Sequence, residues 1–276
     1  MPSRLIRFGL AALVATLLSQ TASAQRAPIG VPPDLHSGNL RSDDGTISYC
    51  IDDRIPGWEV DRDIALAIAD ALLLEPRFVY ITEELGARSQ DYMGVPENVL
   101  FILLDDKCDA FAGMPIGDRI VHPEFVTPSP PYMTTHYVIA SKVDGIDALA
   151  DFEAEDSPRL GVPVQSPMTG SLAYYSPQTR IHVFRNEAIL LDAIFDEKVP
   201  AGIFLETTLR AMLRESQDAP PLSIHPATGL PGSEWLVGML LLNNRTYMRE
   251  LLSDGIRTLT ADGTIDEILR EAGLTP

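Results

Sequence analysis

The sequence predicts an α/β fold with mostly parallel sheets, because two alternations of strand and helix are joined to one fully apolar strand. Strand and helix patterns follow one another in residues 46–114 and again in residues 160–217. Such an order implies parallel strand pairs connected by right-handed crossovers. Residues 235–242 are nearly all apolar, which is typical of a strand covered on both faces.

The first alternation begins at residue 46, after a stretch rich in Pro, Gly and Ser. Val60, Ile64 and Ile68 recur at helical spacing, with acidic residues on the other faces. Pro96 is placed for the first turn of a second helix. The expected elements are strands at 46–51, 77–82 and 109–114, and helices at 59–74 and 96–106.

The second alternation follows a break at residues 129–131 and ends at Pro220-Pro221. A short helix is expected after Thr169, and the chain returns through the apolar strand at 235–242. The other expected elements are strands at 137–141, 160–164, 180–184 and 199–205, and helices at 186–196, 206–217, 245–260 and 264–272.

The charge balance excludes some classes of partner. The chain has 276 residues, with 39 Asp and Glu against 21 Lys and Arg, which gives a net charge of −18. A field of this sign repels phosphate backbones and acidic lipids, so we expect no nucleic-acid partner.

The N-terminus has the pattern of a secretory signal peptide. Arg4 and Arg7 precede an apolar run at 8–18, and Ala22-Ser23-Ala24 is a small-residue cleavage site. We expect cleavage after Ala24, a flexible leader at 25–45 and export to the periplasm of a Gram-negative cell.

The sequence contains two cysteines, Cys50 and Cys108. An even pair in an oxidising compartment suggests a disulfide, and the strands that carry them are expected to be parallel neighbours within bridging distance. Two buried free thiols are the alternative. Neither cysteine has a second metal ligand at a usual spacing, so no metal site is expected.

Enzyme motifs are mostly absent from the sequence. It has no glycine-rich dinucleotide fingerprint, no phosphate loop and no nucleophile elbow, and its five histidines are scattered. We therefore expect no catalytic residues and no cofactor.

Arg119 is the candidate ligand contact that the spacing itself indicates. It follows the expected buried strand that ends at Gly113, where open α/β sheets bind ligands. A guanidinium there suits a carboxylate held through two hydrogen bonds, and an exposed surface arginine is the alternative.

Five motifs in this order resemble the extracellular solute-binding proteins of family 3. The motif Gly57-Trp58-Glu59-Val60-Asp61 is similar to the entry into that family's first helix. The others lie at 109–119, 125–132, 162–169 and 261–269, where Asp262-Gly263-Thr264 starts the C-terminal helix.

The resemblance implies two lobes, a hinge of two crossing segments and a ligand cleft between the lobes. Lobe 1 is expected to contain 46–136 and 223–276, and lobe 2 to contain 137–222. Arg119 would hold a carboxylate, Ser166 and Thr169 would offer hydroxyl or amide groups, and Glu206 would hold an amino group. Trp58 is included among the expected ligand contacts.

Some features depart from that family's pattern. Only residues 52–58 join the first strand to the first helix, and Pro115 stands where Thr is usual. Cys50, Cys108-Asp109 and the Gly113–Pro115 segment are similar to a branch associated with quinoprotein alcohol dehydrogenases.

The resemblance therefore implies two main functions. The first is capture of a small amino-acid or carboxylate ligand by a monomer that serves a membrane permease of the ABC type. The second is an accessory role for a periplasmic quinoprotein methanol or alcohol dehydrogenase, with a poor cleft and an exposed apolar patch. A dehydratase on this fold is a third possibility and needs a proton donor in the cleft.

Overall fold

The computed structural model describes residues 45–85, 94–117, 120–164, 166–216 and 219–274, all within the unit Asn39–Pro276. The predicted signal peptide and nearly all of the predicted leader lie outside these residues. No helix in the described part of the chain has the length and apolar character needed to cross a membrane.

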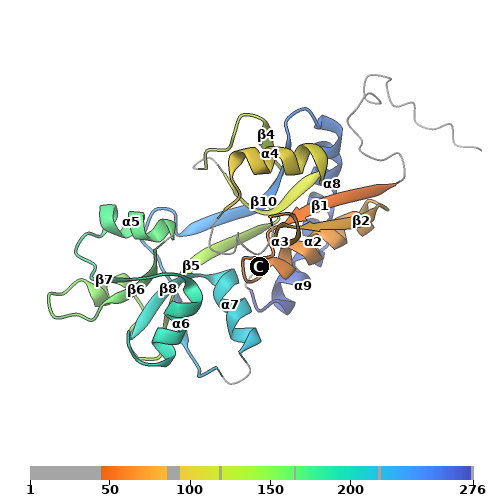
Figure 1. Cartoon of the computed structure of the whole chain (residues 1–276). Helices are drawn as coiled ribbons and strands as arrows, with labels where there is room; N and C mark the ends of the chain where they lie inside the picture. The colour runs from red at the N-terminus through yellow and green to blue at the C-terminus, as the bar shows by residue number, and fades with distance from the viewer. Residues whose placement is uncertain (1–44, 86–93, 118–119, 165, 217–218, 275–276) are drawn as a thin grey trace, which may run out of the picture. The chain divides into compact units, whose positions relative to one another are not determined.

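The predicted α/β class is confirmed, and helices alternate with strands along the chain (Figure 1). The elements up to the middle of the chain are β1 (Thr46–Ile51), α2 (Trp58–Ala71), β2 (Glu75–Tyr80), α3 (Ile81–Leu85), α4 (Glu97–Asp106), β3 (Ala110–Ile116), β4 (Val126–Pro128) and β5 (Met133–Ser141). The remaining elements are η3 (Leu149–Phe152), β6 (Leu160–Pro163), α5 (Pro167–Tyr175), β7 (Ile181–Phe184), α6 (Glu187–Phe195), β8 (Ala201–Leu205), α7 (Glu206–Glu215), β9 (Ser223–Pro226), β10 (Glu234–Leu242), α8 (Thr246–Ala261) and α9 (Thr264–Glu271).

The strands follow the order β2-β1-β3-β10-β5-β8-β6-β7, with β4 on β10 and β9 on β5. The predicted crossover units pair in parallel: β1 lies between β2 and β3, and β6 lies between β7 and β8. The two long strands β5 and β10 run antiparallel to their neighbours.

Strand β5 belongs to two sets of pairings. Residues 133–136 pair with β10, whereas residues 137–141 pair with β8. The strand therefore leaves one sheet and enters the other without a break in the chain. The residue boundaries predicted for two lobes, at 136/137 and 222/223, stay a prediction.

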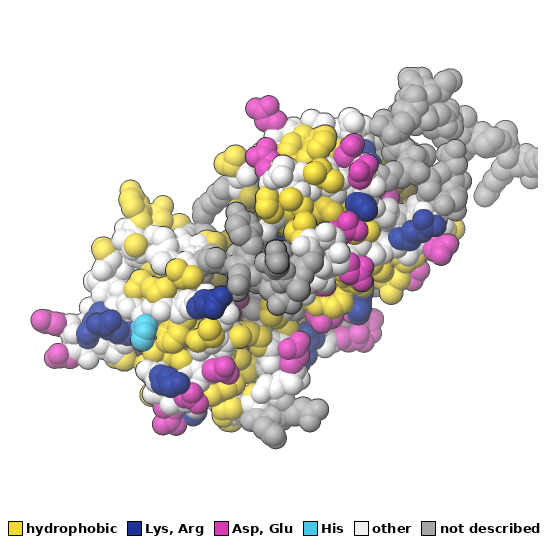
Figure 2. All heavy atoms as spheres, viewed as in Figure 1, with side chains coloured by type: hydrophobic (Ala, Val, Ile, Leu, Met, Phe, Trp, Pro, Cys, Tyr) yellow, Lys and Arg dark blue, Asp and Glu magenta, His cyan; other side chains and the backbone are white. Residues whose placement is uncertain are grey.

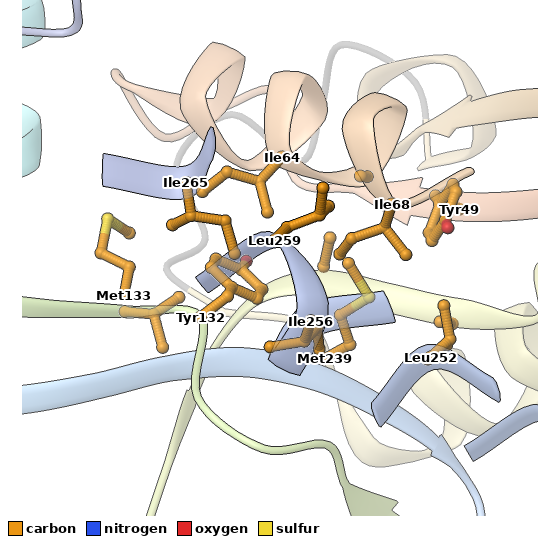
Figure 3. Close-up of a cluster of buried hydrophobic side chains, with 14 of the residues drawn as sticks. Tyr49, Ile64, Ile68, Tyr132, Met133, Met239, Leu252, Ile256, Leu259 and Ile265 are labelled. Carbon is orange, nitrogen blue, oxygen red and sulfur yellow. The ribbon is translucent and has the colours of Figure 1, made fainter. Parts of the chain in front are cut away.

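Helices cover both faces of the sheet that contains β1, β3 and β10. On one face, a buried cluster joins these strands to α2, α8 and α9, and Figure 3 shows Ile64 and Ile68 of α2 beside Leu259 of α8 and Ile265 of α9. On the other face, α4 packs through Leu100, Leu103 and Leu104. The apolar β10 is buried between these layers, as its sequence predicts.

The sheet around β6 and β8 has its own two clusters of buried side chains. One includes Phe152, Leu160 and Leu172, and the other includes Leu190, Ile194 and Phe204. Gly161 and Gly202 let Leu190 approach this sheet, because a Cβ atom at either position would lie within 3.0 Å of the leucine side chain.

Strand β3 extends beyond its expected end at Gly113-Met114 to Ile116. The reason is β10, which returns from the far end of the sequence and pairs Val237 with Pro115 and Leu236 with Ile116. A partner so distant in the sequence cannot be identified from the local pattern, and proline is generally disfavoured inside a sheet.

The structure contains the predicted disulfide between Cys50 and Cys108, whose Cα atoms are 5.5 Å apart. The predicted reason is also found, because β1 and β3 are parallel neighbours in which Cys50 lies opposite Phe111. Both cysteines are fully buried, so the bond is part of the core beneath α4.

We expect the double variant Cys50→Ala/Cys108→Ala to lower the free energy of unfolding by about 2–4 kcal/mol, because the bond closes a loop across 58 positions of the unfolded chain. Urea unfolding followed by circular dichroism would measure this. Dithiothreitol should destabilise the wild type under unfolding conditions and leave the double variant unchanged. Equal stability of the two proteins would contradict the prediction.

Candidate functional site

A small cavity lies where the start of α2, the paired strands β3, β10 and β5, and the start of α7 come together. Its volume is about 120 Å³. This is small compared with the roughly 300–1,000 Å³ of sites for drug-sized ligands. The lining residues are Ile51, Asp52, Ile55, Pro56, Gly57, Trp58, Asp61, Ala112, Gly113, Pro115, Met133, Thr135, Leu205, Thr207, Trp235 and Val237.

One face of the β10–β5 pair supplies part of the lining. Met133 lies opposite Val237, and Thr135 lies opposite Trp235. Alternate residues of a strand point to the same face, so these four side chains reach the cavity together. Trp235 is fixed by its indole N–H, which donates to the carbonyl of Gly232 at 2.9 Å.

Helix α2 contributes Trp58 and Asp61, which lie three positions apart and therefore share one face of the helix. Trp58 stacks edge-on against Tyr80, with ring centroids 5.3 Å apart, and the Arg62 guanidinium lies 5.3 Å from the centroid of the indole. These contacts hold the indole beside the cavity.

Asp61 is tied to two other segments. The Tyr132 hydroxyl donates to Asp61 Oδ1 at 2.6 Å, and the amide of Gly113 donates to the same hydroxyl at 2.7 Å. Gly113 has φ +77°, and a Cβ atom there would lie 2.7 Å from Asp61 Oδ2. Only glycine allows both the backbone conformation and the close approach.

Burial away from water raises the pKa of Asp61 to about 7; Glu59 acts in the same direction, and the Tyr132 hydroxyl opposes the rise. The carboxyl group is therefore poised to change its charge near neutral pH. A group with such a pKa in a cavity is a candidate for a functional role.

Two further polar groups line the cavity. Asp52 binds Arg54 through both carboxylate oxygens, at 2.6 Å each, so its charge is already balanced. Thr135 is 3% exposed, and its Oγ1 is buried without a hydrogen-bond partner in the structure. A buried hydroxyl without a partner costs free energy, on the order of 1–3 kcal/mol.

The residues predicted as ligand contacts lie in different places. Trp58 lines the cavity, whereas Arg119 lies outside the described residues. Ser166, Thr169 and Glu206 do not line the cavity. Their roles as ligand contacts stay predictions.

The side chains of those three residues have local partners. Ser166 caps α5 by accepting a hydrogen bond from the amide of Met168, and Thr169 donates to the carbonyl of Pro163 at 2.9 Å. Glu206 forms an ion pair with Arg210 at 3.2 Å.

Sequence reasoning missed Asp61 and Thr135 as site residues. Asp61 stood in the motif that suggested the first helix, and its spacing from Trp58 could have placed both on one face. Thr135 carried no such signal, because its burial depends on the register with Trp235 on β10. Among the described residues, no group of three or more His, Cys, Asp or Glu side chains could hold a metal ion.

The surface around these elements carries mixed charge. On the face shown in Figure 2, basic side chains occur singly among acidic ones, with apolar patches between them. Phe101 and Ile102 of α4 are 44% and 53% exposed.

The similarities of this chain to known proteins lie at the level of structure. No protein-family model and no curated protein matches the sequence. Many solved structures are similar in fold, including an ancestral cationic amino-acid solute-binding protein (TM-score 0.63, 18% identity, 82% of this chain and 95% of that chain). Substrate-binding domain 2 of Lactococcus lactis GlnP, in an open conformation, gives a TM-score of 0.65 at 15% identity, covering 85% of this chain and 98% of that chain.

An ancestral amino-acid-binding protein described as a precursor of cyclohexadienyl dehydratase is also similar (TM-score 0.55, 19% identity, 82% of this chain and 94% of that chain). These similarities lend no support to the quinoprotein-associated branch.

We expect Gly113→Ala to destabilise the protein by about 1–3 kcal/mol, because the new Cβ meets Asp61 and alanine resists a positive φ. Gly145→Ala is the matched control, since Gly145 has φ +81° with nothing within 4 Å of its Cβ position. The difference between the two variants in chemical denaturation isolates the contact with Asp61. Equal losses would show that this contact has no energetic effect.

We also expect stability to depend on pH through Asp61. Its pKa of about 7 in the folded state exceeds the value of about 3.9 in the unfolded chain, so the folded state holds the proton longer. The contribution of this group to stability is therefore present below pH 4 and is lost as the pH rises to about 7. Burial raises the pKa of Glu187 to about 7 as well, with the same sign.

Thermal unfolding between pH 4 and 8 would test this dependence. Asp61→Asn should reduce the fall in melting temperature across this range, whereas Asp63→Asn on the same helix should leave it unchanged. Identical pH profiles for Asp61→Asn and the wild type would contradict the assignment.

Fold similarity at 15–19% identity identifies an architecture. The chain therefore has the two-lobed α/β fold of the periplasmic amino-acid-binding proteins, as its motifs predict.

Proposed function

We propose that this chain is a periplasmic solute-binding protein that captures a small organic ligand, of the amino-acid or carboxylate type, for an ABC-type transporter. The observation that carries the proposal is the cavity at β3, β10 and β5. It combines apolar walls with a few polar groups, which is the usual composition of a small-molecule site. The buried Thr135 hydroxyl supports the proposal, because a ligand could supply the partner that it lacks.

The two predicted lobes give this cavity a means of opening. We propose that the part of the chain around β1, β3 and β10 moves relative to the part around β6 and β8, with hinges in β5 and between β9 and β10, because β9 pairs with residues 138–141 of β5. The start of α7 lies against the start of α2, where a Cβ atom at Gly57 would lie 3.1 Å from the Thr207 carbonyl oxygen. Hinge closure of this kind encloses a ligand between the lobes.

We propose a binding role without catalysis. A dehydratase would need a positioned proton donor, for which Asp61 is a candidate, and a substrate pocket larger than this cavity. The accessory role for a quinoprotein dehydrogenase predicted a poor cleft, and the small cavity does not by itself separate that role from solute binding. The exposed Phe101 and Ile102 would be the apolar patch for that alternative, but nothing in the fold similarities favours it.

Calorimetry with a panel of amino acids and organic acids would test the proposal. We expect one ligand per chain and thermal stabilisation by that ligand. Trp58→Ala should weaken binding by about tenfold or more, because it removes a wall of the cavity. Phe101→Ala removes an exposed aromatic ring from α4 and should leave the affinity unchanged.

Arg119→Ala separates the carboxylate contact from the rest of the site. It should weaken binding of carboxylate ligands by several kcal/mol if Arg119 is the predicted anchor, since a charge-assisted contact is lost. No heat with any ligand in the panel would count against the solute-binding function.

A further inference from the structure

We propose that the cavity recognises an ammonium group, held between Asp61 Oδ2 and Thr135 Oγ1, and that a small apolar amine without a carboxylate is sufficient as a ligand. The inference rests on the proposed function, namely that this cavity binds an organic molecule. It adds the chemical class of the recognised group and names the two side chains that contact it.

Asp61 offers one carboxylate oxygen to a ligand. Oδ1 already accepts the hydrogen bond from Tyr132, and within the described part of the chain no hydrogen bond reaches Oδ2. Tyr132 in turn accepts the amide of Gly113, so the carboxylate is held in one orientation. An acceptor fixed in this way is prepared for a donor from the ligand.

Thr135 supplies an independent second observation. Its hydroxyl is buried without a partner and belongs to the face of β5 that lines the cavity. A hydroxyl can accept a hydrogen bond, and an ammonium group has three donors. An ammonium group therefore has enough donors for both Asp61 and Thr135, which line the same cavity.

The charges of the lining favour a cation. The described lining residues include two carboxyl groups, Asp52 and Asp61, and no basic side chain. Arg54 balances Asp52 from outside the cavity, whereas Asp61 forms no ion pair with a described residue. An anion placed there would face Asp61 without compensation, which is costly in a desolvated site.

The N-terminus of α2 does not reverse the preference of the cavity for a cation. A helix N-terminus attracts anions through its free amides. Here the amide of Trp58 donates to the carbonyl of Ile55, and that of Val60 donates to the carbonyl of Gly57. Glu59 and Asp61 also add negative charge to this first turn.

The remaining lining residues indicate the size and polarity of the rest of the ligand. Trp58, Met133, Trp235 and Val237 present apolar surface, and the volume of about 120 Å³ limits the ligand to a small skeleton. A short branched aliphatic chain carrying one ammonium group fits these walls and this size.

Three related molecules would test the inference by calorimetry. Leucine carries both charged groups, isopentylamine lacks the carboxylate, and isocaproate lacks the ammonium. We expect leucine and isopentylamine to bind and isocaproate to bind at least about tenfold more weakly than isopentylamine. Arg119→Ala should weaken the binding of leucine and leave the binding of isopentylamine unchanged.

Matched variants then assign the contacts. Asp61→Asn keeps the shape of the side chain and should weaken isopentylamine binding by about tenfold or more, whereas Asp63→Asn should not. Thr135→Val should weaken it severalfold and also raise the melting temperature of the unliganded protein, because a buried hydroxyl without a partner is removed. Thr134→Val, on the exposed opposite face of β5, should not weaken binding.

The pH dependence gives a readout that a purely structural role would not move. Between pH 6 and 8 the affinity for isopentylamine should rise, because Asp61, with a pKa of about 7, ionises while the amine stays charged. Glu59 and Tyr132 also influence the pKa of Asp61. Asp52 is the other carboxyl group that lines the cavity, and it is paired with Arg54. Asp61→Asn should remove this dependence.

The possible outcomes separate the two proposals. Tight binding of isocaproate without isopentylamine, or isopentylamine binding that Asp61→Asn leaves intact, would overturn the ammonium site while the solute-binding function stands. If another panel member binds, its own decarboxylated and deaminated analogues replace the leucine set. If no molecule binds to the wild type, both proposals fail. If Asp61→Asn does not fold, Thr135→Val and the pH profile of the wild type decide.

Discussion

The hydrogen bonds that join Asp61, Tyr132 and Gly113 hold the centre of this structure together. They connect α2, the segment that leads into β5, and β3, which are far apart in the sequence. Their geometry requires glycine at position 113, because any Cβ atom there would lie on the carboxylate. They also fix one wall of the cavity, so the fold and the candidate site depend on the same three groups. A change at any of them should therefore act on stability and on the proposed ligand binding together.

Strand β5, which pairs with β10, connects the sheet near these hydrogen bonds to the second sheet. The first half of β5 pairs with β10 and the second half pairs with β8, so the strand is a continuous link between two sets of packed helices. Ser129 strengthens the link before β5, because its hydroxyl accepts the amide of Met239 on β10 at 2.9 Å. The cavity lies at this link, because residues of both β5 and β10 line it.

The local parts of the fold could be predicted from the sequence, whereas the parts that depend on distant pairing could not. The bounds of β1 and the Cys50–Cys108 disulfide follow from apolar patterns and from parallel pairing of neighbouring strands. The extension of β3 to Ile116 and the short strand β9 exist because β10 and β5 supply partners from far along the chain. The candidate site also combines local and distant information. Trp58 was predicted as a ligand contact from a local motif, whereas Thr135 lines the cavity because of its register with Trp235 on β10.

The cavity contains groups that weaken the folded state. Thr135 buries a hydroxyl without a partner, and Asp61 is a carboxyl with little access to water. Such costs gather at functional sites, where a binding partner can relieve them. An ammonium group in contact with Asp61 and Thr135 would relieve both costs at once. Under the proposed hinge motion, the free energy released would favour the arrangement seen in this structure, in which α7 lies against the start of α2. Ligand selection and closure would then depend on the same contacts.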